Sequence, residues 1–386
     1  MNNFQFVNPV KIIFGKNTLE NLPSVIPAGS KVLIIYGGGS IKRSGLLNEI
    51  KNTLKNYKLG EFGGIEPNPS YEKLMQAVEI IRSEKYDFLL AAGGGSVIDG
   101  TKFIAAAVPF MADDPWKIIS EHIPVKKAVP FGTVLTLPAT GSEMNNGAVI
   151  TRKSLKSKLP FMSAAVFPKF SILDPVYTYT LPQKQIANGV VDAFIHVMEQ
   201  YMTYPVNAKI QDRFSEGLLL TLIEEGPKAL QNPQNYDVRA NIMWAATLAL
   251  NGLISSGVPQ DWSTHMVGHE ITALYGLDHA QTLAIVFPSM LKVMKNEKQQ
   301  KLLQYGNRIW DIDTNMPVEA QIDKAIQKTQ SFFEEMGVKT HFSDYHLDKS
   351  VVEKIIDSLI SHNMTKLGEN GSVNPDIVRK VLNLSL

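Results

Sequence analysis

The sequence predicts an α/β N-terminal domain with a Rossmann-like parallel sheet over residues 1–180, followed by an all-helical C-terminal domain over residues 181–386. In the first half, short β-branched and apolar runs alternate with amphipathic stretches, which is typical of parallel strands joined by helices. In the second half such runs largely stop, and apolar residues follow the period of helices. The length of 386 residues also suits two domains, each with its own core.

Three segments of the first half are predicted to be strands that end in a glycine-rich turn. They are KVLIIY (31–36) followed by GGGS, YDFLLAAGGGS (86–96) and FGTVLTLPATGSE (131–143). A helix is predicted over residues 41–57. Because ligands of an open parallel sheet bind beyond the carboxyl ends of its strands, we expect these turns to form a binding site.

The segment 171–185 carries Pro175 and Pro182 and marks the expected domain boundary. Beyond it, apolar spacing predicts helices over residues 186–203, 207–229, 237–255, 262–275 and 282–295. We expect the active cleft between the two halves, because domain interfaces are common ligand sites.

Composition narrows the class of function. The net charge is +1 and only 19% of residues are charged, so no strong field favours nucleic acid or an anionic membrane. No apolar run approaches the roughly 20 residues needed to span a bilayer, and the N-terminus does not resemble a signal peptide. We therefore expect a cytoplasmic protein that acts on small molecules. Cysteine is absent, so nitrogen and oxygen atoms would have to bind any metal.

Two of the glycine turns, YGGGSIKRSG (36–45) and AAGGGSVIDG (91–100), follow a strand and open a helix. Neither matches the dinucleotide fingerprint G-x-G-x-x-G, whose last glycine would fall at Lys42 or Ile98. Backbone N–H groups in such turns can still approach a phosphate at the positive end of a helix. Two such turns favour nucleotide binding over the alternative that the glycines only make tight turns.

The polar residues of these turns suggest which nucleotide is bound. Asp99, three residues after Ser96, could complement the helix dipole or accept a hydrogen bond from the nucleotide, and the sequence leaves both roles open. The first turn lacks the carboxylate that reads the ribose of NAD and instead offers Ser40, Lys42 and Arg43. This pattern favours NADP(H).

Histidines cluster in the helical half. His265, His269 and His279 lie within fifteen residues, where even spacing of the eight histidines would place fewer than one. Residues four apart share a helix face, so Asp192 with His196, and His265 with His269, could each aim two atoms at one point. Taken singly, an ion pair or a loop histidine is the simpler interpretation. Together they predict a site for a divalent first-row metal ion.

These features resemble the iron-containing, or group III, alcohol dehydrogenases, and within them the NADPH-dependent aldehyde reductases and butanol dehydrogenases. The resemblance runs along the whole chain, in KIIFG (11–15), EFGGIEPNP (61–69), GGGSVIDGTKFIAAA (93–107), LPATGSE (137–143), LDPVYTYTLP (173–182), NGVVDAFIHVMEQY (188–201) and GLDHAQTLAIV (276–286). It implies the dehydroquinate synthase-like fold, hydride transfer between NADP(H) and small aldehydes or primary alcohols, one Fe²⁺ or Zn²⁺ per subunit, and a homodimer.

The resemblance also implies roles for particular residues. The family's metal ligands match Asp192, His196, His265 and His279. His269 matches a histidine near the nicotinamide and substrate, where it would donate a proton or order a water molecule. The cofactor positions carried over are Gly37, Gly38, Gly39, Ser40, Gly94, Gly95, Ser96, Asp99, Thr140 and Ser142, with Lys158 expected to reach the 2′-phosphate.

Two alternatives share the fold. A glycerol dehydrogenase-like enzyme would oxidise polyols, and a non-catalytic nucleotide sensor would bind NADPH without consuming it. The retained set of four metal ligands argues against a sensor, which has no use for an open metal site.

Overall fold

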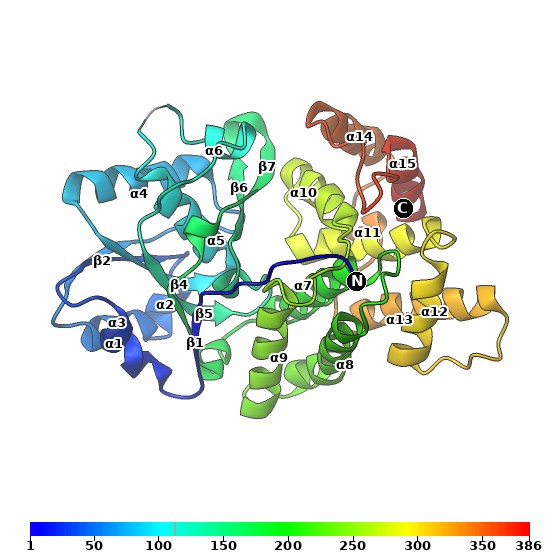
Figure 1. Ribbon diagram of the computed structural model, residues 1–386, viewed down its shortest axis with the longest axis horizontal. Coiled ribbons are helices and arrows are strands. Elements are labelled where there is room, and N and C mark those ends of the chain that lie inside the picture. The colour runs from blue at the N-terminus through cyan, green and yellow to red at the C-terminus, as the bar shows by residue number, and fades with distance from the viewer. Residues whose placement is uncertain (112) are drawn as a thin grey trace. The chain divides into compact units, whose positions relative to one another are not determined.

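The computed structural model describes residues 1–111 and 113–386, which form two compact units. One unit contains the strands and comprises Val7–Leu181 and Gln234–Thr247. The other is helical and comprises Met1–Phe6, Pro182–Pro233 and Leu248–Leu386. Figure 1 shows the elements of both, and each unit is described by itself below.

The strand-containing unit is built on a six-stranded sheet in which all neighbouring strands are parallel, as predicted. Its order is β1 (Lys11–Phe14), β8 (Phe170–Leu173), β5 (Phe131–Leu137), β4 (Phe88–Gly94), β2 (Lys31–Tyr36) and β3 (Lys58–Phe62). A separate antiparallel hairpin consists of β6 (Gly147–Arg152) and β7 (Ser157–Met162).

Helices cover both faces of this sheet. Successive residues of a strand point to opposite faces, so Leu89 and Leu90 of β4 belong to two different cores. The core around Leu89 includes Leu74 of α4 and Phe103 of α5, whereas the core around Leu90 includes Ile50 of α3. The helices are α1 (Leu22–Val25), α2 (Ser40–Arg43), α3 (Leu46–Thr53), α4 (Tyr71–Glu84), α5 (Gly95–Ala107), α6 (Lys117–Ser120) and, mostly in this unit, α9 (Tyr236–Ala249).

Two predicted helices differ from the structure at glycines with positive φ. The helix predicted over 41–57 is divided into α2 and α3, because Gly45 between them has φ 86°, a left-handed conformation that glycine adopts readily. The helix predicted over 237–255 ends at Ala249, and Gly252 follows with φ 89°. Short 3₁₀ helices cover Thr18–Asn21 (η1), Ser142–Met144 (η2), Lys153–Leu155 (η3), Ala164–Val166 (η4), Pro175–Thr178 (η5) and Phe342–Tyr345 (η6).

The helical unit is organised around α7 (Gln183–Tyr201), whose residues from Ile186 onward are almost all buried. It packs against α8 and α11, while α10 and α11 share a core with the last two helices. The remaining helices are α8 (Lys209–Gln231), α10 (Ser263–Tyr275), α11 (His279–Val293), α12 (Gln299–Trp310), α13 (Val318–Glu335), α14 (Val351–Ser361) and α15 (Pro375–Leu384).

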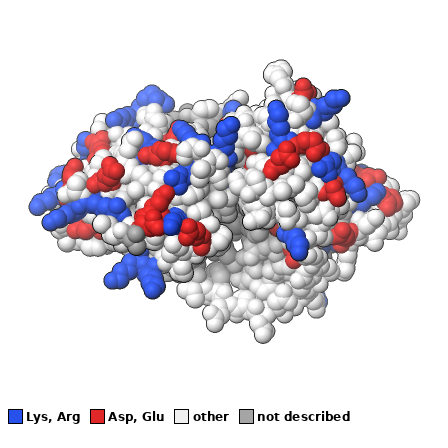
Figure 2. All heavy atoms as spheres, turned by 90° about the horizontal axis from the view of Figure 1, so that it is seen from above, with Lys and Arg blue, Asp and Glu red and all other residues white. Residues whose placement is uncertain are grey.

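Neither charge dominates the face of the molecule seen in Figure 2. Lysines and arginines mix with aspartates and glutamates over much of the face seen in Figure 2, which agrees with the net charge of +1. Within residues 1–111 and 113–386, none of the helices combines the length and apolar character that crossing a membrane requires.

Candidate metal and cofactor sites

The predicted metal ligands from three helices of the helical unit lie close together. Asp192 is on α7, His265 is on α10 and His279 is the first residue of α11. Each offers one ligand atom, and these atoms lie within 4.8 Å of one another. Asp192 Oδ1 is 3.9 Å from His265 Nε2 and 3.8 Å from His279 Nε2. Asp192 therefore meets two histidines that lie more than 70 positions later in the chain.

The fourth predicted ligand, His196, borders this group without belonging to it. Its Nδ1 is 3.6 Å from Asp192 Oδ1, one helical turn away, and its ring centroid is 4.6 Å from that of His265. Burial lowers the pKa of His196 to about 4, although the Asp192 carboxylate opposes the shift. His196 is therefore neutral near pH 7, which is the form of imidazole that binds metals.

His269 lies beside the same group. It follows His265 by one turn of α10 and is only 3% exposed. Its ring centroid is 6.4 Å from that of His265 and 5.1 Å from that of His279. It is not among the three residues whose ligand atoms converge. The structure thus brings three of the five predicted residues to one point, with His196 and His269 beside them.

Local backbone features position His279. Gly276 ends α10 with φ 71°, the left-handed conformation common at helix C-termini. Two residues later, Asp278 caps α11 through a capping box with Gln281. The chain between the two helices is short, so His279 at the start of α11 returns toward His265.

This donor set fits a divalent metal ion. Imidazole nitrogens with one carboxylate oxygen suit first-row divalent ions, iron and zinc among them. The helices that carry the donors are packed into buried cores, which favours a preformed arrangement.

The glycine-rich turns of the strand-containing unit lie at one edge of its sheet, because β2, β4 and β5 are neighbouring parallel strands. At the first turn, Gly39 precedes α2 and has φ 105°. Gly37 lies close to Ile65, and a Cβ added to it would be 3.3 Å from the Ile65 carbonyl oxygen. At the second turn, β4 ends at Gly94 and α5 begins at Gly95. In both turns, glycine backbone therefore leads directly into the first turn of a helix.

The second and third turns contact each other. A Cβ on Gly95 would lie 2.5 Å from Thr140 Oγ1, so only glycine permits this approach. Asp99 Oδ1 accepts a hydrogen bond from Ser142 Oγ at 2.5 Å, and its Oδ2 accepts one from the backbone N–H of Val149 at 2.9 Å. Asp99 thus holds the third turn and the start of β6 in place.

Lys158 lies in the hairpin, in β7, opposite Thr151 of β6. It is 5% exposed, and its charge acts to lower the pKa of Asp99, so the two side chains are near each other. Burial nevertheless raises the pKa of Asp99 overall. The predicted cofactor residues therefore gather at the three turns and the hairpin next to them.

Comparisons with known proteins give the family. Residues 9–175 match the family model of iron-containing alcohol dehydrogenase, and residues 186–384 match its C-terminal counterpart. The chain belongs to the iron-containing alcohol dehydrogenase family. It is 58% identical over 383 residues to the NADPH-dependent aldehyde reductase YqhD of Escherichia coli, covering 99% of each chain. It is 41% identical over 390 residues to the probable NADH-dependent butanol dehydrogenase 1 of Bacillus subtilis, covering all of both.

Solved structures of family members have the same fold as this chain. The crystal structure of E. coli YqhD has 56% identity and a TM-score of 0.98, covering 100% of this chain and 99% of that one. The NADH-dependent butanol dehydrogenase A of Thermotoga maritima has 33% identity and a TM-score of 0.95, with the same coverage. The family resemblance and the fold class predicted from the sequence are thus confirmed.

Two buried charged residues of this iron-containing alcohol dehydrogenase were not singled out from its sequence. Lys102 of α5 donates hydrogen bonds to Asn145 Oδ1 and Gly147 O, both at 2.7 Å, and burial lowers its pKa to about 8. Glu199 of α7 is also buried, and its carboxylate contacts His265 Nδ1. The one available signal was that Glu199 lies seven residues after Asp192, on the same face of a helix.

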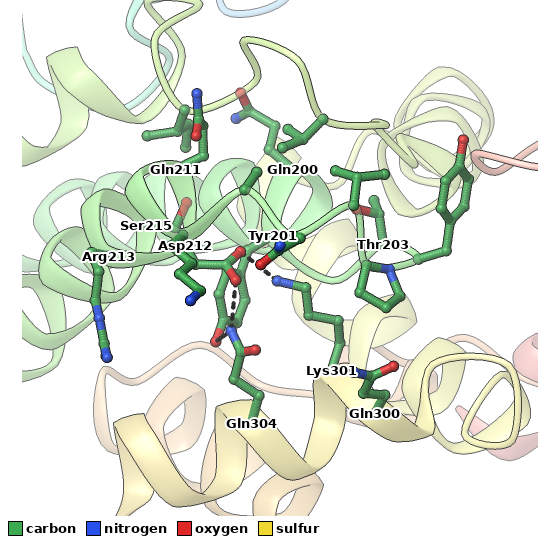
Figure 3. Close-up of a pocket in the computed structure, with 18 of the residues that line it drawn as sticks. Gln200, Tyr201, Thr203, Gln211, Asp212, Arg213, Ser215, Gln300, Lys301 and Gln304 are labelled. Carbon is green, nitrogen blue, oxygen red and sulfur yellow. Dashed lines mark hydrogen bonds and ion pairs between the residues drawn. The ribbon is translucent and has the colours of Figure 1, made fainter. Parts of the chain in front are cut away.

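The enzyme also has a cavity of about 600 Å³ in its helical unit, and none of the predicted site residues lines it. In Figure 3, Lys301 and Gln304 of α12 point toward Asp212 and Tyr201. The Lys301 ammonium pairs with Asp212 Oδ1 at 2.5 Å, and Gln304 Nε2 donates to Tyr201 Oη at 2.9 Å. Because none of the predicted site residues lines it, this cavity is not the candidate active site.

Proposed function

We propose that this iron-containing alcohol dehydrogenase interconverts small aldehydes and primary alcohols by hydride transfer with NADP(H). We propose further that residues 1–180 bind the dinucleotide and that residues 181–386 bind one divalent metal ion, Fe²⁺ or Zn²⁺. The observation that carries the proposal is the convergence of Asp192, His265 and His279 in a chain 58% identical to an NADPH-dependent aldehyde reductase.

The proposed ligands of the ion are Asp192, His196, His265 and His279. When bound, the ion would polarise the carbonyl group and the reduced nicotinamide would supply the hydride. Asp192 contributes the one negative charge of this set and so offsets part of the charge of the cation. The histidines contribute neutral nitrogen donors, as the lowered pKa of His196 illustrates.

His269 is proposed to hold the proton that the product alcohol requires. Its ring lies 5.1 Å from that of His279, at the border of the ligand group. Imidazole exchanges protons near neutral pH, either directly or through an ordered water molecule. Placing it beside the ligands, and not among them, leaves it available for this role.

The preference for NADP(H) over NAD(H) is proposed on two grounds. The first turn has no carboxylate and offers Ser40, Lys42 and Arg43, which suit a 2′-phosphate. The relative with 58% identity is named as NADPH-dependent, whereas the Bacillus subtilis and Thermotoga maritima relatives at 41% and 33% are named as NADH-dependent. Gly37, Gly38, Gly39, Gly94, Gly95, Ser96, Asp99, Thr140, Ser142 and Lys158 complete the proposed cofactor site.

A spectrophotometric assay tests the function. The protein, loaded in turn with Fe²⁺ or Zn²⁺, is mixed with butanal and either NADPH or NADH, and the nicotinamide absorbance is followed. We expect steady loss of NADPH absorbance, faster than that of NADH, and none after the metal is removed by a chelator. Binding of NADPH without any loss would instead support a nucleotide sensor. Faster turnover with glycerol and NADP⁺ than with butanol would support a polyol dehydrogenase.

We also propose that the enzyme is a cytoplasmic homodimer. The proposed use of NADPH, a reductant generated inside cells, supports this location. The dimer is supported by three exposed apolar residues of α8, Ile210, Phe214 and Leu220, which we call the α8 apolar face. A second copy of this chain would cover that face.

A further inference from the structure

Glu199 lies directly behind the proposed metal site. It is on α7, one turn beyond His196 and two turns beyond Asp192, so the three side chains share a helix face. Its side chain is only 2% exposed. A carboxylate buried to this extent requires hydrogen-bond donors that offset its lost hydration.

The donors come from the first turn of α10. Glu199 Oε1 accepts a hydrogen bond from the backbone N–H of Thr264 at 2.7 Å, and Oε2 accepts one from that of His265 at 3.1 Å. Oε2 also contacts Nδ1 of the His265 ring. The backbone N–H of Asp261 donates to the carbonyl oxygen of Glu199 at 2.9 Å, which further fixes α10 against α7. The N–H groups of a first helical turn have no partner within the helix and favour a negative group.

We propose that Glu199 is a positioning residue that orients His265 and fixes its tautomer for metal binding, an inference that rests on the proposed function. A carboxylate at Nδ1 accepts the ring N–H there and so leaves the lone pair on Nε2. That nitrogen is the one 3.9 Å from Asp192 Oδ1, within the group of converging ligand atoms. A partner behind a ligating imidazole sets its orientation and increases its basicity.

The substitution Glu199→Gln tests this role with little change in shape. The single amide oxygen cannot replace both carboxylate oxygens. If it faced His265, the backbone N–H of Thr264 would lose its acceptor; when it keeps the hydrogen bond from Thr264, the amide N–H₂ lies against His265 Nδ1 and the backbone N–H of His265. The ring must then accept at Nδ1 and carry its proton on Nε2, where the metal would bind. We expect the affinity of the metal-depleted protein for Zn²⁺, measured by competition with a chromophoric chelator, to fall by about 10–100-fold.

Glu270→Gln is the matched control. Glu270 is 1% exposed and lies on α10, where it accepts a hydrogen bond from Ser358 Oγ at 2.5 Å and contacts His362 Nδ1 at 2.8 Å. It is therefore a buried glutamate with a histidine partner outside the proposed ligand set. We expect Glu270→Gln to leave zinc affinity within about threefold of that of the unchanged protein. The reason is that the Glu270 side chain contacts Ser358 and His362, which are not proposed ligands, and zinc affinity depends on the partners of the ligands.

A second readout separates positioning from packing. The ¹⁵N chemical shifts of the histidine ring nitrogens report the tautomer in the metal-depleted protein. We expect Glu199→Gln to move the proton of one ring, that of His265, from Nδ1 to Nε2. Glu199→Asp, which keeps the charge but moves it back by one methylene, should keep the tautomer and bind zinc with intermediate affinity. Circular dichroism of each variant confirms folding, and Glu199→Asp decides the question if Glu199→Gln does not fold.

Several outcomes would overturn the inference. Unchanged zinc affinity in folded Glu199→Gln would do so, as would equal losses in Glu199→Gln and Glu270→Gln, or loss of the tautomer in Glu199→Asp. If the unchanged protein itself failed to bind zinc, the proposed metal site would be wrong, and this inference would fall with it.

Discussion

His265 and His269 lie one helical turn apart on α10, yet we assign them different roles. His265 is among the residues whose ligand atoms converge, whereas His196 and His269 lie beside them. The family resemblance matches His196 to a ligand and His269 to a histidine near the nicotinamide. We expect His265→Ala to remove the metal and abolish turnover, because it deletes a ligand. We expect His269→Ala to keep the metal and to lower kcat by about 100-fold or more, as loss of proton transfer does. Elemental analysis and steady-state kinetics of the purified variants check both. Full metal occupancy in both variants would show that the ligand assignment is wrong.

The sequence was most informative about residues whose partners lie on the same helix. Asp192 and His196 are four positions apart, so their shared face follows from helical geometry alone. The contact between Glu199 and His265 joins residues 66 positions apart, and it depends on how α7 packs against the start of α10. No local pattern contains that information. Lys102 was missed for a similar reason, because its partners Asn145 and Gly147 lie beyond β5.

At the scale of elements, the N-cap of α11 supports the candidate site. Asp278 caps this helix, and His279 is its first residue. We expect Asp278→Ala to lower the free energy of unfolding by about 0.5–2 kcal/mol, as loss of a helix cap does, and also to weaken zinc binding. Asn374→Ala is the control, since Asn374 caps α15 by accepting from the backbone N–H of Ile377 at 3.0 Å. It should destabilise the protein to a similar extent without changing zinc affinity. Equal zinc affinity in both variants would contradict the link between the cap and the site.

A buried ion cluster at the start of α12 predicts a dependence of stability on pH. Lys298 Nζ is 2.7 Å from Asp261 Oδ2 and 3.0 Å from Glu369 Oε2. Burial and the neighbouring Asp261 raise the pKa of Glu369 to about 7 from its usual 4.5, although Lys298 opposes the shift. Between these pH values the folded state binds more protons than the unfolded state. The contribution of Glu369 is therefore fully present below pH 4.5 and is lost as pH rises through 7.

The variant Glu369→Gln tests this dependence by chemical denaturation at several pH values. We expect the unchanged protein to lose about 1–2 kcal/mol more than Glu369→Gln between pH 4.5 and pH 7, after allowance for solvent screening. Other titrating groups are common to both proteins and cancel in the difference. Parallel stability curves for the two proteins would contradict the raised pKa.

Two features of the elements could not be predicted from local sequence pattern: where glycine breaks a helix, and which distant strands pair. Apolar periodicity indicated the long helices, but the division of residues 41–57 depends on the left-handed conformation of Gly45. β1 and β8 are paired in the sheet, but they are the first and the last strand in the sequence. Neither strand is next to the other in the chain, so the order of the sheet could not be derived from local pattern.

At the scale of the whole molecule, the α8 apolar face predicts self-association. Ile210 and Phe214, one helical turn apart, are 60% and 48% exposed, and Leu220 further along α8 is 44% exposed. Several exposed apolar residues on one helix are typical of subunit interfaces. We expect the unchanged protein to sediment as a dimer in analytical ultracentrifugation, and Phe214→Glu to weaken the dimer at least about tenfold, because it would bury a charge without a partner.

Ile360→Glu provides the matched control for this experiment. Ile360 is as exposed as Phe214, at 48%, but it lies on α14 and outside the α8 apolar face. The same change in charge and size there should leave the dimer intact if the α8 apolar face is the interface. A monomeric unchanged protein would refute the dimer. Equal dissociation of both variants would place the interface elsewhere and leave the α8 apolar face without this role.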